Sequence, residues 1–481
     1  MNKISFKAIL TVMLPITMAG CGTAHKMKFA DYMEAYKLAD YCKAADKALD
    51  KSDVCQMSAE DIKPDKFNID EKLNGGTALF LAQKTNLSNK IFEETAKEIQ
   101  EDLESMGLAR GAVEVVANAS IVDYNPMIMD GIYLHSYTLL NALAQNNKDE
   151  AKIQVNRAYN VQQKAVETFS KEIQKQNEEN TKDVAQMQKE VQEANQKNIS
   201  DIMENYKEFK RFNGYANFVN PYVTYMSGLY LMTNGHSNSD YETASNYLKR
   251  VSGMVRHNKF VKQDLSLANK LASGTQKNLV PTAWVVFENG LVANFEEFRL
   301  DLPIFIATNN VKTASLALPY PKEREIAYKN ISVSNGNKKV TTELLADIDN
   351  IFMAEFKKKL PIIVTKAVTK LTLQTVAQAV AQNEFGDLGG IAMSAYSVMT
   401  AGADTRSWYS LPKNVQLAKI AKKGTKLTLN IGGQDYKVEV PQKGNSIVYV
   451  RVPAAGATPV ISVLDLSLIH ISEPTRPRLI S

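Results

Sequence analysis

Two stretches of the chain decide its fold: Asn125-Pro-Met-Ile-Met-Asp-Gly-Ile-Tyr-Leu134 and Asn220-Pro-Tyr-Val-Thr-Tyr-Met-Ser-Gly-Leu-Tyr-Leu231. Each begins with Asn-Pro, an N-cap residue followed by the residue that best suits a first helical turn. Each then reaches Gly, an apolar residue, Tyr and Leu, and a turn follows at Asn146-Asn147 or Asn234-Gly235. Chance rarely produces this order twice, so the sequence predicts two copies of one helix pair.

The second helix of each predicted pair carries a small residue followed by apolar residues four and seven positions later. These residues are Ala151, Val155 and Ala158 in one copy, and Ala244, Leu248 and Val251 in the other. A third pair is predicted at Thr77–Lys84 and Ser88–Met106, with a turn at Asn74-Gly75-Gly76 before it and Asn86 in its link. Helix pairs with this spacing resemble tetratricopeptide repeats, whose period is about 34 residues. The sequence therefore predicts a degenerate, tetratricopeptide-like (TPR-like) helical-repeat array over residues 21–278.

Residues 148–212 separate the two copies and form the most polar part of the chain. They are rich in Gln, Asn, Lys and Glu and contain neither Gly nor Pro from Asp149 to Phe212. This composition predicts a long helix or a helical hairpin. The segment either projects to contact a partner or is a solvated spacer with a thin apolar seam. We favour the spacer, because too few heptads are sustained to specify a coiled coil.

The pattern changes to strands from Leu279 onward. Short apolar or alternating runs predict strands, and a hairpin turn is expected at Gly432-Gly433-Gln434-Asp435. The predicted strands are Ala283–Phe287, Phe298–Ile306, Val311–Leu318, Ile331–Val333, Val415–Ile420, Leu427–Ile431, Tyr436–Val440 and Ile447–Val452. A helical insert is expected at about 341–402, with its first helix at Thr341–Lys358. The predicted fold is therefore α+β and multidomain, with a β-sandwich-like domain at 279–465 that a helical insert interrupts.

The first twenty residues are predicted to be an export signal. Lys3 and Lys7 precede the apolar run Ala8–Met18, which is too short to span a bilayer. The run ends in Met18-Ala-Gly-Cys21, which resembles the lipobox of bacterial lipoproteins. That resemblance implies a diacylglyceryl group on the Cys21 sulfur, cleavage before Cys21 and acylation of the new amino end. The alternative is an ordinary secretory signal with an accidental cysteine.

The expected location follows from the lipid and from the next residue. Two or more acyl chains anchor a protein stably, whereas one holds it only marginally. Gly22 follows the cysteine, where inner-membrane lipoproteins of enterobacteria carry Asp. The resemblance therefore implies an anchor in the outer membrane, on its periplasmic face.

Residues 466–481 are expected not to belong to the natural protein. Leu466-Ser-Leu-Ile-His-Ile-Ser-Glu-Pro-Thr-Arg476 resembles the translation of a transposase adapter used in sequencing libraries. His470 therefore carries no functional meaning.

Composition and cysteine content narrow the class of partner. The net charge is +5. Without the two lysines of the signal, and without the net single positive charge of the last sixteen residues, the mature chain stays near +2. A net charge near +2 gives no strongly basic surface, so we expect no nucleic-acid partner. Cys42 and Cys55 remain after lipidation, and in an oxidising periplasm they either form a disulfide or stay unpaired.

No catalytic motif is present, so we expect no enzyme activity, no metal and no cofactor. His135 on a predicted repeat helix suits packing better than catalysis. Asp404, Arg406 and Trp408 form the best polar cluster. They could bind a sugar or a peptide carboxylate through the Arg fork, or form a structural ion pair within a loop. Glu288, Glu296 and Glu297 would be the paired acids of a glycan-cleaving enzyme, the rival function.

Three stretches carry a resemblance at family level: Trp284-Val-Val-Phe-Glu-Asn-Gly290, Asp349–Pro361 with Glu355-Phe-Lys357, and Ala403-Asp-Thr-Arg-Ser-Trp-Tyr-Ser-Leu-Pro412. Together with the lipobox they resemble uncharacterised bacterial outer-membrane lipoproteins with a TPR-like amino half. The resemblance implies architecture and location but no activity. We therefore expect a membrane-anchored scaffold or adaptor for envelope proteins, with the peptidoglycan-synthesis machinery as one concrete partner. The alternative is a glycan-active or glycan-binding protein.

Overall fold

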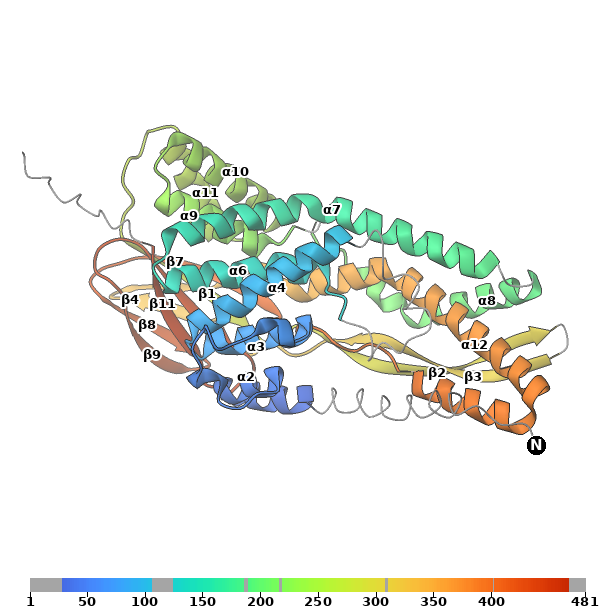
Figure 1. Ribbon diagram of the computed structural model, residues 1–481. Coiled ribbons are helices and arrows are strands. Elements are labelled where there is room, and N and C mark those ends of the chain that lie inside the picture. The colour runs from blue at the N-terminus through green and yellow to red at the C-terminus, as the bar shows by residue number, and fades with distance from the viewer. Residues whose placement is uncertain are drawn as a thin grey trace, which may run out of the picture.

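The computed structural model describes residues 28–105, 124–185, 189–215, 219–307, 310–400 and 402–466. The fold is α+β: helices fill the amino-terminal half, and strands with one long helix fill the carboxyl-terminal half (Figure 1). The predicted change near residue 279 is confirmed, because the last helix of the first half ends at Ala272 and the first strand begins at Thr282.

Helices make up most of the described part of the first half. They are residues 28–37, α2 (Tyr41–Leu49), α3 (Ile69–Leu81), α4 (Thr85–Ser105), α6 (Ile128–Ala144), α7 (Lys148–Ala185), α8 (Lys189–Asn205), α9 (Pro221–Asn234), α10 (Asn238–Met254) and α11 (Lys259–Ala272). Short 3₁₀ turns lie at Val54–Gln56, Pro64–Lys66 and Lys207–Arg211. The polar segment 148–212 is thus helical as predicted, and α7 and α8 divide it.

Of the two helix starts predicted at Asn-Pro, the one at Asn220 is confirmed and the other lies later in the chain than predicted. The side chain of Asn220 caps α9, accepting hydrogen bonds from the backbone N–H of Tyr222 at 3.0 Å and of Val223 at 3.4 Å. The other helix, α6, begins after the N-cap Met127 rather than at Asn125-Pro126. Here Asp130 closes the first turn by accepting from the N–H of Met127 at 2.9 Å.

The predicted turn at Asn74-Gly75-Gly76 is wrong, because these residues lie inside α3. Helix packing explains the two glycines. A Cβ on Gly75 would lie 2.6 Å from Cγ of Leu49, and one on Gly76 would lie 2.7 Å from Cε1 of Phe92. The glycines therefore let α2 and α4 approach α3 closely. Asn86, predicted in a link, lies in the first turn of α4.

The strands of the second half form three sheets. One has five strands in the order β11-β10-β1-β7-β6, one has four in the order β5-β4-β8-β9, and β2 and β3 form a long hairpin. β1 runs parallel to β10 and antiparallel to β7. The bounds are β1 (Thr282–Asn289), β2 (Asn294–Ala307), β3 (Asn310–Lys322), β4 (Ser332–Asn335), β5 (Lys338–Thr341), β6 (Glu343–Asp347), β7 (Asn414–Ala421), β8 (Lys426–Ile431), β9 (Gln434–Glu439), β10 (Ser446–Val452) and β11 (Val460–Asp465).

The helical insert is one element, α12 (Ile348–Thr400). The predicted start at Thr341 is wrong, because residues 343–347 pair with β7 as strand β6. The hairpin at Gly432-Gly433 between β8 and β9 is confirmed.

An arm extends from the body of the molecule (Figure 1). We use this name for the distal half of α7, α8, the β2–β3 hairpin and α12 beyond Pro361. Its elements are joined by side chains of α8: Asn198 donates to the carbonyl of Pro303 at 3.0 Å, and Asn195 accepts from the hydroxyl of Thr372 at 2.9 Å. The arm is therefore a packed structure rather than a single projecting helix.

Candidate functional site

The loop that carries the predicted polar cluster runs back from α12 toward β7. Arg406 donates from Nε to Oδ1 of Asp404 at 2.9 Å and from Nη2 to Oδ2 at 2.7 Å. The guanidinium fork is thus occupied by a carboxylate two residues away, and the Arg406 side chain is only 9% exposed. This geometry is that of an ion pair within a loop, the second of the two interpretations of the cluster.

Trp408 faces the interior of the protein, whereas a residue of an open ligand site would face solvent. It is 1% exposed, and its Nε1 donates to Oγ1 of Thr77 in α3 at 2.9 Å. Its ring lies 5.9 Å from that of Phe92 and 5.7 Å from that of Tyr137. Trp408 therefore packs the loop onto α3, α4 and α6, and the three predicted residues do not form one open site.

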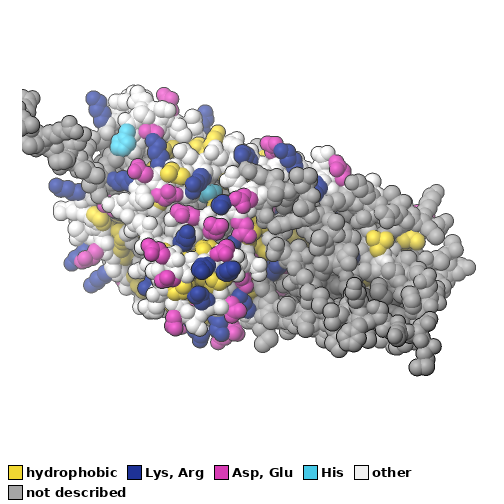
Figure 2. Space-filling model, viewed as in Figure 1, with side chains coloured by type: hydrophobic (Ala, Val, Ile, Leu, Met, Phe, Trp, Pro, Cys, Tyr) yellow, Lys and Arg dark blue, Asp and Glu magenta, His cyan; other side chains and the backbone are white. Residues whose placement is uncertain are grey.

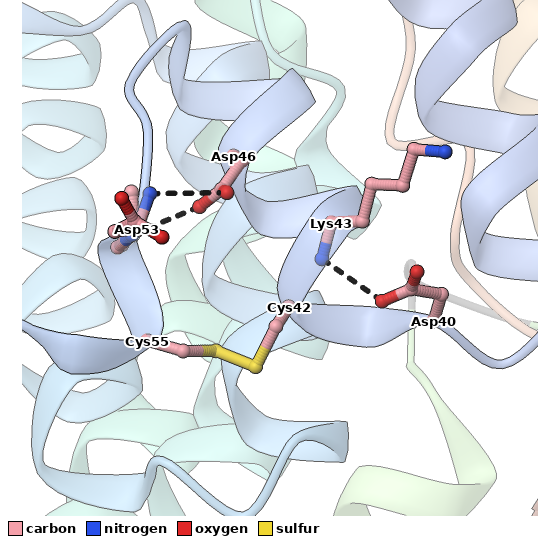
Figure 3. The surroundings of a disulfide bond; sticks show 7 residues. Asp40, Cys42, Lys43, Asp46, Asp53 and Cys55 are labelled. Atoms are coloured by element: carbon pink, nitrogen blue, oxygen red, sulfur yellow. Dashed lines mark hydrogen bonds between the residues drawn. A yellow bond between two sulfur atoms is a disulfide. The ribbon is translucent and has the colours of Figure 1, made fainter.

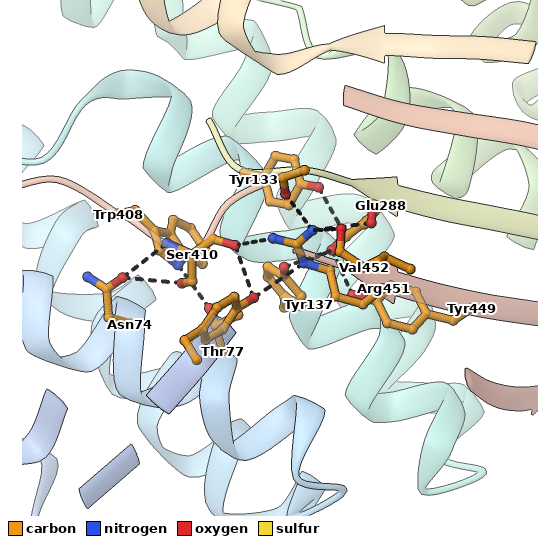
Figure 4. Close-up of polar contacts among 12 residues, drawn as sticks. Asn74, Thr77, Tyr133, Tyr137, Glu288, Trp408, Ser410, Tyr449, Arg451 and Val452 are labelled. Carbon is orange, nitrogen blue, oxygen red and sulfur yellow. Dashed lines mark hydrogen bonds and ion pairs between the residues drawn. The ribbon is translucent and has the colours of Figure 1, made fainter. Parts of the chain in front are cut away.

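A buried polar cluster centres on Glu288 near the end of β1 (Figure 4). Its carboxylate accepts three tyrosine hydroxyl hydrogen bonds: Tyr133 at 2.9 Å, Tyr137 at 3.0 Å and Tyr449 at 2.6 Å. Tyr133 and Tyr137 come from α6 and Tyr449 from β10. We call Glu288, Arg451 and these three tyrosines the hub.

Arg451 of β10 supplies the opposite charge. Its Nε lies 3.9 Å from Oε2 of Glu288, and both side chains are fully buried. Most of its donors go to backbone carbonyls, including Gly290 at 2.6 Å and Ser410 at 2.9 Å. Tyr36 of the first helix donates to that same carbonyl of Ser410 at 3.2 Å. The pair thus joins β1, β10, the 402–411 loop, α6 and the first helix.

The two charged side chains of the hub, Glu288 and Arg451, have no contact with solvent. Burial raises the pKa of Glu288, and Arg451 and the three hydroxyls oppose that increase. Each carboxylate oxygen already accepts from a hydroxyl, so the group has partners within the protein for both oxygens. A buried pair broken on one side is costly, because the remaining charge loses its partner. The arrangement therefore fixes elements to one another.

The sequence carries a signal for the hub in two of its strands. Glu288 and Arg451 each stand near the end of an apolar strand, in Ala283-Trp-Val-Val-Phe-Glu288 and Ile447-Val-Tyr-Val-Arg451. A charged residue in a strand that is otherwise apolar on both faces has to find a partner inside the protein. The prediction of a site at Asp404, Arg406 and Trp408 does not use this signal. The pairing itself spans 163 residues, so local patterns could not reveal it.

The carboxylates of the rival glycan-cleaving function lie in different surroundings. Glu288 is in the hub. Glu296 is half exposed and pairs with Lys322 at 3.0 Å, whereas Glu297 pairs with Arg299 at 2.7 Å. Glu296 and Glu297 are neighbours on one strand, so their side chains point to opposite faces. The three acids therefore do not converge on one substrate position.

A second buried acidic group joins α12 to the start of α6. Glu355 of α12 accepts from the backbone N–H of Ile128 at 2.8 Å and of Met129 at 3.1 Å, and it pairs with Lys359. A carboxylate at a helix N-terminus satisfies free N–H groups and the helix dipole. Close by, burial raises the pKa of Asp130 to about 7. These acids too hold elements together.

His135 packs within the helical half. It is 5% exposed and Nδ1 lies 3.0 Å from Oε1 of Gln154 in α7. Burial lowers its pKa to about 4, so the ring stays neutral at physiological pH. The structure joins Cys42 and Cys55 in a disulfide, which ties α2 to the turn at Val54–Gln56 (Figure 3).

The predicted export signal with Cys21, and residues 467–481, lie outside the described residues. Within the ranges given above, no group of His, Cys, Asp and Glu could hold a metal ion, and no helix is apolar enough over a sufficient length to span a membrane. On the face seen in Figure 2, positive and negative side chains are interspersed over the body. Comparison with protein-family models, curated proteins and solved structures found no match.

Proposed function

We propose that the protein is a lipid-anchored periplasmic scaffold, tethered to the outer membrane through Cys21, that holds another envelope protein. One observation carries the proposal: α7, the helix that runs from the body into the arm, exposes large apolar side chains. Ile153 is 43% exposed, and Tyr159 and Val166 are each 40% exposed. Tyr159 also stacks on Tyr247 of α10, with ring centroids 5.5 Å apart. Exposed aromatic side chains such as Tyr159 are typical anchors of protein interfaces.

The helix pairs support a repeat-like organisation of the scaffold. A Cβ on Gly228 of α9 would lie 3.1 Å from Cγ of Leu248 in α10, as one on Gly76 of α3 would meet Phe92 of α4. In both pairs the glycine of the first helix faces a large apolar residue of the second helix, Leu248 or Phe92. Gly131 differs, since its Cβ would meet Ile99 of α4. Repeat arrays leave extended faces free for partners.

The experiment is a crosslinking pull-down of the anchored protein from its host, with Cys21→Ala as the unanchored control. We expect a stoichiometric envelope partner that only the anchored form captures, with a component of peptidoglycan synthesis as the concrete expectation. The double variant Tyr159→Ala/Val166→Ala should lose that partner.

The matched control is Leu38→Ala, which removes a side chain that is 73% exposed and follows the helix at residues 28–37 rather than belonging to α7. It should keep the partner. If the α7 variant retains the partner, the partner binds elsewhere. If instead the purified protein releases fragments from cell-wall glycan, the scaffold proposal fails.

A further inference from the structure

The free edges of the two multi-stranded sheets are protected in different ways. An unpaired strand edge is a template for pairing with another chain, so proteins cover such edges or charge them. The edge of β6 is covered: Asn258 donates to the carbonyls of Glu343 at 3.3 Å and Leu344 at 2.9 Å. The hydroxyl of Tyr215 accepts from the N–H of Asp347 at 3.2 Å on the same strand.

The two edges of the four-stranded sheet are charged. β5 carries Lys338 and Lys339 in four residues, and β9 carries Asp435, Lys437 and Glu439 in six. Charged side chains on an edge disfavour pairing with another copy of the same strand.

β11 is protected less than these strands, although α6 packs against it. It lies at the end of the five-stranded sheet, and within the described residues no strand pairs with its outer edge. Its sequence is Val460-Ile-Ser-Val-Leu-Asp465, and all of these residues except Leu464 are partly exposed. Three of its residues are β-branched and the first five carry no charge. This edge is therefore chemically suited to accept a further strand.

The strand is also complementary to itself. If two copies pair antiparallel with Ser462 opposite Ser462 of the second copy, Ile461 lies opposite Val463 and Val460 opposite Leu464. Apolar residues then face apolar residues at every pair around the central serines, and such cross-strand pairs stabilise a sheet. The single charge, Asp465, lies opposite Pro459, so no like charges meet.

We infer that the outer edge of β11 is a dimerisation site, at which two copies of this chain pair antiparallel about Ser462 and form one continuous ten-stranded sheet. This contact is isologous and closed, because the same strand contributes both sides. The inference does not depend on the proposed function. It concerns the sheet at the opposite end of the body from the arm (Figure 1), so the arm of each copy would stay free.

The test is a cysteine crosslink in cells that express the full-length protein. Directly opposed residues of an antiparallel pair have Cα atoms about 4.5–5.5 Å apart, within the range of a disulfide. Ser462→Cys should therefore give a disulfide-linked band of twice the monomer mass on a non-reducing gel. Lys437→Cys, on the charged edge of β9, is the matched control and should stay monomeric.

The register is tested by charge. Adding Ile461→Lys to the Ser462→Cys chain should abolish the crosslinked band, because it places an unpaired ammonium opposite Val463. Adding Val463→Glu as well should restore the band, because each Lys then faces a Glu of the second copy. Restoration also shows that the single variant failed to pair rather than failed to fold.

Three outcomes for the Ser462→Cys chain would overturn the inference. The introduced thiol could stay monomeric yet react with maleimide, which would mean an open edge without a second copy. It could be unreactive, which would mean that the chain's own continuation covers it. It could crosslink to a different protein, which would assign the edge to a partner strand.

Discussion

At the scale of single residues, the buried Glu288 carboxylate accepts hydrogen bonds from three tyrosine hydroxyls and faces the guanidinium of Arg451. Replacing it with Gln removes the charge that faces Arg451 and puts an amide donor among three hydroxyl donors. We expect Glu288→Gln to lower the free energy of unfolding by about 3–5 kcal/mol. Tyr449→Phe removes one donor only and should cost about 1–2 kcal/mol. Urea denaturation measures both.

The control for the tyrosine is Tyr436→Phe. The Tyr436 hydroxyl also donates a hydrogen bond, at 2.9 Å to Gln434, but at an exposed strand edge. Its loss should leave stability unchanged within about 0.5 kcal/mol. Equal effects of Tyr449→Phe and Tyr436→Phe would show that the hub hydroxyls do not stabilise the carboxylate.

Asp130 gives a prediction for pH. Burial raises its pKa to about 7, against 3.8 for an ordinary Asp, while Tyr124, the Met127 N–H and Lys359 oppose the shift and Glu355 adds to it. Between pH 4 and 7 the folded state therefore binds a proton that the unfolded state has released. Stability contributed by this group is present below pH 4 and is lost as the pH rises to 7, by up to about 1.4 kcal/mol per unit.

We therefore expect the wild type to lose more stability than Asp130→Asn between pH 5 and pH 7. Urea midpoints at the two pH values, with Asp435→Asn as an exposed-carboxylate control, measure the difference. Parallel pH curves for the wild type and Asp130→Asn would contradict the shift, whatever their absolute values.

At the scale of elements, the glycines of α3 and α10 should respond oppositely to one methyl group. A Cβ on Gly76 would lie 2.7 Å from the ring of Phe92, which is fully buried, so the packing around the ring would have to shift. Gly76→Ala should cost about 1–3 kcal/mol through overpacking.

Gly253 in α10 is exposed and has nothing within 4 Å of such a Cβ. Gly253→Ala should stabilise by about 0.5–1 kcal/mol through helix propensity. Thermal unfolding of the two variants decides whether contact or propensity governs these positions.

Several element boundaries show which parts of the fold the sequence could predict. The start of α9 and the Gly432-Gly433 hairpin depend on local chemistry, capping and positive φ, and both are confirmed. Asn74-Gly75-Gly76 contains typical turn residues, yet close packing from Leu49 and Phe92 keeps them helical. Residues 343–347 follow helical spacing locally, but pairing with β7 makes them a strand. Tertiary contacts overrode local preference in both cases.

The candidate site was less predictable than the fold. Asp404, Arg406 and Trp408 stand close together in one short loop, so the sequence could indicate them, with a structural ion pair as one interpretation. Local patterns could not predict that Trp408 would pack on Thr77, 331 residues away, or that Glu288 would meet Tyr133 and Tyr137 of α6. Such contacts are properties of the assembled chain.

At the scale of the whole molecule, these contacts join the helical half to the sheets. The hub places α6 on β1 and β10, Arg451 links the first helix to the 402–411 loop, and Glu355 of α12 caps α6. A boundary between helices and strands at about residue 279 is therefore a change of secondary structure within one continuous core. Breaking the chain there would expose buried charges on both sides.

This continuity predicts that the two halves unfold together, and the two tryptophans of the chain can report it separately. Trp284 of β1 donates to Asp264 of α11 at 3.0 Å, whereas Trp408 donates to Thr77 of α3 at 2.9 Å. Both are buried, so each loses its surroundings only when its own region opens. In Trp284→Phe and Trp408→Phe, the remaining tryptophan should show a urea midpoint that coincides with the far-ultraviolet circular dichroism midpoint of the same variant, as a cooperative transition requires. Comparison within each variant removes the stability cost of the substitution itself. If Trp408 instead changes its fluorescence at lower urea than the circular dichroism signal, the helical half separates first, and the hub fastens the two halves without making them one folding unit.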